Sequence, residues 1–190
     1  MAPRKRELLL LRHGIAEERG DHIDDAQRAL TPQGRERLAL VIRRLADLEL
    51  QCDVVLSSPL VRARQSAELV RQLGLAPELE LASALAPLAD PLPLLERWLG
   101  PVSPRQGWRR LALVGHEPDL STLAALLIGV PMAAAPHALR LKKGGVAVLQ
   151  WPSRVEGPLV GTARLGLLLS PRSLIGRAVG SATERGPGGP

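Results

Sequence analysis

The chain has 190 residues, of which 45% are apolar and 23% are charged, and it carries a formal net charge of +6 at pH 7. This length and balance are typical of one globular domain and exclude disorder of the whole chain. Aromatic residues make up 2%, and most of the excess positive charge lies in residues 4–6 and beyond residue 169. We therefore expect no nucleic-acid partner.

Neither a membrane segment nor a secretory signal is expected. The sequence has no run of roughly 18 uncharged apolar residues, the length that a membrane helix needs. The basic N-terminus leads into only four leucines, residues 8–11, before Arg12 and His13 follow. The single cysteine, Cys52, allows no intrachain disulfide and no thiolate zinc cluster. These features together predict a cytoplasmic protein.

Five segments are predicted to be β-strands. Three of them have a short apolar core rather than an alternating pattern, which indicates strands that are covered on both faces, as in a parallel sheet. These three are residues 7–11, 53–57 and 110–115. Two further strands are predicted at residues 145–151 and 160–168.

Helices are predicted after these strands, over residues 32–48, 59–73 and 119–128. Thr31 and Ser58 are expected to cap the first two, because their hydroxyls can accept hydrogen bonds from free N–H groups of the first turn. Repeated prolines across residues 85–107 predict a loop-rich connection with at most a short helix around 93–99.

The alternation of strands and helices predicts a three-layer α/β/α sandwich with a mostly parallel central sheet. We expect the domain to span residues 7–174. Residues 1–6 are expected to form a flexible basic leader, and the Gly/Pro-rich residues 175–190 a disordered tail.

Polar residues follow the predicted strands at the point where ligands bind in such sheets. Arg12, His13 and Gly14 end the first strand, and His116 follows the third. Arg62 lies in the first turn of the helix after the second strand. The sequence therefore predicts that two guanidinium groups and two imidazoles meet in one crevice.

This set of side chains favours phosphate chemistry. Guanidinium groups match phosphate oxygens with their planar forks, and the start of the helix at residue 59 adds free N–H groups. A neutral imidazole can attack phosphorus. The sequence has no Walker loop and no cluster with metal-ligand spacing, which disfavours nucleotide-dependent transfer and a dinuclear metal phosphatase.

Four motifs in this order resemble the signatures of the histidine phosphatase superfamily: LLLLRHG (8–14), LTPQG (30–34), SSPLVRARQSA (57–67) and LVGHEP (113–118). The chain is similar in particular to the small SixA-type phosphohistidine phosphatases. The short length and the segments GHEPDLSTL (115–123), LRLKKGGVAVL (139–149) and LLLSPRSL (167–174) carry that narrower resemblance. It covers residues 7–174 and implies a compact, phosphoglycerate-mutase-like fold.

The resemblance implies a role for each residue at the strand ends. His13 would be the nucleophile that takes the phosphoryl group, while Arg12, Arg62 and His116 would hold the phosphate oxygens. Gly14 would let the backbone pass close to the phosphate. No metal and no organic cofactor are expected.

Asp25, on the loop before LTPQG, has two interpretations. It could help proton transfer, or it could pair with Arg28, and we favour the structural pairing. Larger superfamily members place a proton-donating carboxylate in the segment that here reads LASALAPLAD (81–90), where only Asp90 is acidic. They also carry a long helical insertion over the site, which this chain lacks.

A missing acid suits a phosphohistidine substrate, whose imidazole is a good leaving group, and an open site suits a phosphate presented on a protein. We therefore expect a monomeric signal-transduction phosphatase that acts on a phosphorylated protein, namely a histidine phosphotransfer domain. Two alternatives stay open: a phosphatase of a small sugar or nucleotide phosphate, and a non-catalytic phosphate-recognition protein.

Overall fold

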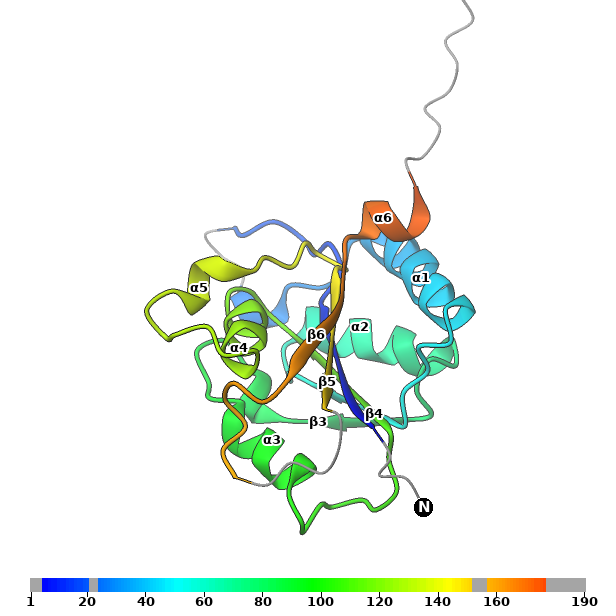
Figure 1. Cartoon of the computed structure of the whole chain (residues 1–190). Helices are drawn as coiled ribbons and strands as arrows, with labels where there is room; N and C mark the ends of the chain where they lie inside the picture. The colour runs from blue at the N-terminus through cyan, green and yellow to red at the C-terminus, as the bar shows by residue number, and fades with distance from the viewer. Residues whose placement is uncertain (1–4, 21–23, 152–156, 177–190) are drawn as a thin grey trace, which may run out of the picture.

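A six-stranded sheet in the order β3-β2-β4-β1-β5-β6 forms the middle layer of the molecule (Figure 1). The computed structural model describes residues 5–20, 24–151 and 157–176. Strands β3, β2, β4 and β1 run parallel to one another, whereas β5 and β6 are antiparallel to their neighbours. The strands are β1 (Arg6–Arg12), β2 (Val54–Ser57), β3 (Glu78–Leu81), β4 (Arg110–Gly115), β5 (Val146–Trp151) and β6 (Arg164–Leu169).

Helices cover both faces of this sheet (Figure 1). One face carries α1 (Pro32–Asp47), α2 (Val61–Gln72) and α6 (Pro171–Ile175). The other carries α3 (Leu92–Leu99) and α4 (Asp119–Leu127), with α5 (Ala135–Ala138) packed on α4. Two 3-10 turns, η1 (Asp25–Gln27) and η2 (Ser83–Leu85), lie in the connections. The predicted mixed α/β sandwich is confirmed.

The four leucines of β1 show why its sequence has no alternation. Leu8 and Leu10 pack into the core under α3 and α4, and Leu9 and Leu11 into the core under α1 and α2. Successive strand side chains point to opposite faces, so a strand that is buried on both faces needs apolar residues at every position. All four are almost fully buried.

Three local predictions differ from the structure. Edge strand β3 was not predicted, because its sequence ELEL is short and mostly exposed. Ser58 does not cap α2, which has Leu60 at its N-cap position with no side-chain cap hydrogen bond. Arg6 belongs to β1, with its guanidinium 4.1 Å from the centre of the Trp108 ring, and is therefore not part of a flexible leader.

The remaining ends lie partly outside the described residues. Residues 1–4 of the expected leader and residues 177–190 of the expected tail are not described, while Ile175 closes α6. None of the helices in the described ranges has the length and the apolar character needed to cross a bilayer.

Candidate active site

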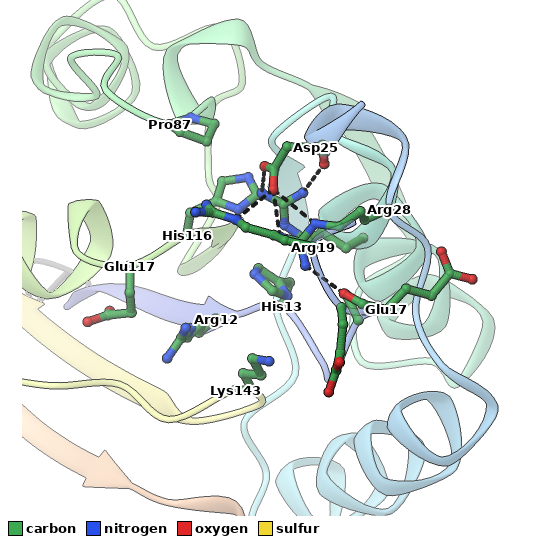
Figure 2. A pocket seen from close by; sticks show the side chains of 13 residues that line it. Arg12, His13, Glu17, Arg19, Asp25, Arg28, Pro87, His116, Glu117 and Lys143 are labelled. Atoms are coloured by element: carbon green, nitrogen blue, oxygen red, sulfur yellow. Dashed lines mark hydrogen bonds and ion pairs between the residues drawn. The ribbon is translucent and has the colours of Figure 1, made fainter. Parts of the chain in front are cut away.

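Arg12, His13, Arg62 and His116 line one cavity of about 410 Å³ (Figure 2). Parallel pairing of β1 with β4 places Arg12 opposite Gly115, and the His13 N–H donates to the Gly115 carbonyl at 3.1 Å. The residues that follow the two strands are therefore neighbours, and the two imidazole ring centres lie 5.2 Å apart. Strand β2 delivers Arg62 from the other side, through the first turn of α2. The structure thus brings the four predicted residues together.

Hydrogen bonding fixes the orientation of the His13 ring. Its Nδ1 lies 2.7 Å from the carbonyl oxygen of Gly14. A carbonyl oxygen can only accept, so Nδ1 carries the proton and Nε2 keeps a free lone pair. Burial, with smaller contributions from His116, Arg62 and Arg12, lowers the pKa of His13 to about 3, although the hydrogen bond to Gly14 acts in the opposite direction. At neutral pH the ring is an uncharged base with Nε2 available as a nucleophile.

His116 is the second neutral imidazole of the site. Its Nε2 lies 2.8 Å from the hydroxyl of Ser58, and its buried Nδ1 has no hydrogen-bond partner among the described residues. Burial lowers the pKa of His116 to about 4, with Arg62 as the next contribution. Ser58 thus orients a site residue, and its hydroxyl also accepts from the N–H of Leu60, the N-cap residue of α2, at 3.3 Å.

Arg12 is held by the turn that precedes β5. Its guanidinium donates to the Leu141 carbonyl at 2.9 Å. Further along the same turn, the Gly144 N–H lies 3.0 Å from the carbonyl of Arg12 and 3.1 Å from that of His13. Lys143, between them in sequence, lines the cavity as an additional cation (Figure 2). Its segment LRLKKGG was noted in the sequence, but nothing there indicated that it meets the strand end of β1.

Asp25 holds Arg62 in place. Its carboxylate accepts from Arg62 at 2.9 Å, and its carbonyl accepts from the same guanidinium at 2.5 Å. Its other carboxylate oxygen accepts from Arg28 at 2.9 Å and from Arg19 at 3.0 Å. Although burial acts in the opposite direction, Arg62 and Arg28 lower the pKa of Asp25 below its usual range. The carboxylate is ionised at neutral pH, which favours the structural pairing over a proton-donor role.

Gly14 follows His13 but is not among the residues that line the cavity. A Cβ at this position would lie 3.2–3.3 Å from Leu30, Gly34 and Leu38. Its N–H donates to the Ser66 hydroxyl at 3.1 Å. The missing side chain therefore serves the close packing of the β1 end against α1.

Glu117 is a second cavity residue that the sequence did not single out, although it stands within the LVGHEP motif. One carboxylate oxygen accepts from the Ser121 hydroxyl at 2.8 Å. The other is buried and has no hydrogen-bond partner among the described residues. Burial raises the pKa of Glu117 above its usual range. Asp90, the carboxylate weighed from the sequence, lies outside this cavity.

Comparison with known proteins agrees with this arrangement. A model of the histidine phosphatase superfamily (branch 1) matches residues 8–85, which include the β1 end and the α2 start. The chain is also 38% identical to an uncharacterised protein of Picosynechococcus sp. (strain ATCC 27264 / PCC 7002 / PR-6) over 173 residues, 89% of this chain and 99% of that protein. The chain belongs to the histidine phosphatase superfamily.

Solved structures of histidine phosphatases share the fold. The protein histidine phosphatase SixA complexed with tungstate matches with a TM-score of 0.72 at 23% identity, over 88% of this chain and 99% of that one. The mycobacterial glucosyl-3-phosphoglycerate phosphatase matches with a TM-score of 0.66 at 18% identity, over 88% and 100%. One histidine phosphatase fold thus serves a protein phosphatase and a sugar-phosphate phosphatase.

Proposed function

We propose that this histidine phosphatase hydrolyses phosphohistidine on a protein, a histidine phosphotransfer domain, through a covalent intermediate on His13. The observation that carries the proposal is the free Nε2 of a neutral His13 in a cavity lined by Arg12, Arg62 and His116. This combines a nucleophile with guanidinium donors for the phosphate oxygens in one cavity.

The reaction runs in two displacements at phosphorus. In the first, the His13 Nε2 lone pair forms a P–N bond while the bond from phosphorus to the substrate imidazole breaks, and the departing nitrogen takes up a proton. In the second, water attacks the phosphorus on His13, inorganic phosphate leaves and His13 regains its lone pair. Arg12 and Arg62 stabilise the oxygens whose charge is redistributed in both transition states.

Glu117 supplies the proton for the leaving group. It lines the cavity, and burial raises its pKa above the usual range, which favours its protonated form. Asp25 lacks this property because its arginine partners keep it ionised. After the first step the Glu117 carboxylate can accept a proton from the attacking water, which restores the acid for the next turnover.

Replacing Glu117 with glutamine should lower turnover most for substrates whose leaving group needs a proton. For aryl phosphates with weakly acidic phenols we expect a loss of kcat/KM, which reports the phosphoryl transfer to His13, of about 100-fold, because general acid catalysis contributes at least that much. p-Nitrophenyl phosphate should lose far less, since its leaving group needs no proton. Steady-state rates across a series of substituted phenyl phosphates give the slope of log kcat/KM against the pKa of the phenol, and this slope measures the dependence.

The control makes the same change on α1, where the exposed Glu36 becomes glutamine. Glu36→Gln should leave the slope unchanged. An equal loss for every leaving group in Glu117→Gln would show that Glu117 has only a structural role.

The uncovered site favours a protein substrate over a small ester. The described connection from β3 to β4 contains only η2 and α3, so no long helical element covers the site there. An uncovered cavity suits a phosphate that projects from a protein surface. The similarity to the sugar-phosphate phosphatase keeps a small ester as the second candidate function.

A substrate panel tests the proposal. We expect kcat/KM for a phosphorylated histidine phosphotransfer domain to exceed that for sugar phosphates by at least about 100-fold, because only the protein adds contacts outside the cavity. Acid-quench trapping should recover an acid-labile phosphoenzyme. A preference for a sugar phosphate would establish the small-ester alternative, and binding without turnover would establish a recognition protein.

A further inference from the structure

A second, mostly apolar depression adjoins the catalytic cavity. It has a volume of about 290 Å³ and lies between the segment 88–92 and helix α4. We call it the α4 groove, and its lining residues are Leu88, Ala89, Asp90, Pro91, Leu92, Asp119, Thr122, Leu123, Leu126 and Met132. Two of them display large apolar side chains to solvent, Leu88 at 93% and Met132 at 64% exposure. Apolar surface gathered around a groove in this way is typical of a recognition site.

The α4 groove is continuous in sequence with the catalytic cavity at two points. Pro87 lines the cavity (Figure 2) and the next residue, Leu88, lines the groove. Glu117 lines the cavity and Asp119 lines the groove. A molecule whose phosphate occupies the cavity would therefore extend its neighbouring atoms over the groove.

The backbone conformation of Leu88 contributes to the exposure of its side chain. Its φ of 66° lies in the left-handed region, which a leucine rarely adopts. The Leu88 N–H donates to the Asp119 carboxylate at 3.2 Å, which ties the segment to the start of α4. The fold thus maintains an unfavourable conformation that places an apolar side chain in water, next to the cavity.

The charge of the α4 groove specifies its occupant. Asp90 and Asp119 are acidic, the lining residues include no lysine or arginine, and neither aspartate has an ion pair among the described residues. A complementary ligand carries apolar side chains together with a basic one. A second copy of this chain seated here would cover the rim at Pro87, and with it the entrance for substrate.

We propose that the α4 groove docks the phosphorylated substrate protein, through a segment next to the phosphorylated histidine that carries apolar side chains and a lysine or arginine. This inference rests on the proposed function and deepens it, because it supplies contacts that a small ester cannot reach. Leu88 is the most exposed apolar side chain of the α4 groove, so its burial by the partner would remove the largest share of apolar surface from water.

The test compares two substrates with the same P–N bond. One is a histidine phosphotransfer domain phosphorylated with phosphoramidate, and the other is free N-phosphohistidine, which cannot reach the α4 groove. We expect Leu88→Asp, and separately Met132→Asp, to raise KM for the phosphorylated domain by about tenfold or more. For free phosphohistidine, kcat/KM of both variants should stay within about twofold of the unmodified enzyme.

Leu40→Asp is the matched control, because Leu40 is a 50% exposed leucine on α1, on the opposite face of the sheet. It should change neither KM for the phosphorylated domain nor kcat/KM for free phosphohistidine. If the groove variants behave like this control towards the domain, or reduce both substrates equally, the docking proposal is wrong. If the unmodified enzyme hydrolyses free phosphohistidine or esters but not the phosphorylated domain, the proposed function fails as well, so the two failures are distinguishable.

Discussion

His13→Ala is expected to abolish hydrolysis, with kcat reduced by at least about 10⁴-fold, as for the loss of a covalent nucleophile in other enzymes. We do not expect His116 to replace His13, because the His116 ring is held through its Nε2 at 2.8 Å from the Ser58 hydroxyl. The measurement uses a phosphorylated histidine phosphotransfer domain and p-nitrophenyl phosphate, together with acid-quench trapping, which should recover no phosphoenzyme.

His137→Ala provides the control, because His137 is exposed on α5 and does not line the cavity. It should retain the turnover of the unmodified protein. Near-normal turnover by folded, purified His13→Ala would refute the covalent mechanism.

Arg62→Ala is expected to weaken vanadate binding by about 10- to 100-fold, which corresponds to roughly 1.5–3 kcal/mol for a charge-assisted hydrogen bond. The loss has a second cause. Asp25 would keep Arg19 and Arg28 but lose its most buried partner, so negative charge beside the cavity would be less well neutralised. Vanadate inhibition constants for the two proteins measure the effect.

Arg172→Ala is the matched arginine deletion, because Arg172 is exposed on α6 and outside the cavity. It should bind vanadate as the unmodified protein does. Similar losses in both variants would mean that the anion does not bind where Arg62 lies.

The sequence was sufficient to predict the elements that have a strong local pattern. Unbroken leucines predicted a doubly covered β1, and the rule that parallel strands carry ligands at their carboxyl ends predicted that Arg12, His13, Arg62 and His116 would meet. Thr31 was predicted as the cap of α1, and its hydroxyl accepts from Gly34 N–H at 2.9 Å. These features depend on periodicity and topology, both of which can be recognised in one sequence.

Other parts of the site depend on contacts between distant loops, for which the sequence carries no periodic signal. Asp25 had been paired with Arg28, three residues away, but its contact with Arg62 spans 37 positions and arises only when η1 packs against α2. Lys143 reaches the cavity because its turn is bonded to the end of β1. Glu117 was visible in its motif, yet its burial, and therefore its chemistry, follows from the tertiary structure.

The turn before β5 also bears on how this enzyme could be altered. Gly144 has a φ of +74°, and a Cβ on Gly145 would lie 2.8 Å from the Lys142 carbonyl oxygen. Side chains at either position would strain the turn whose Gly144 N–H donates to the carbonyls of Arg12 and His13, so these two glycines hold the backbone that carries the nucleophile. An engineer who wished to change substrate preference would vary the α4 groove and keep this glycine pair, because reshaping the turn would misdirect the reaction for every substrate alike.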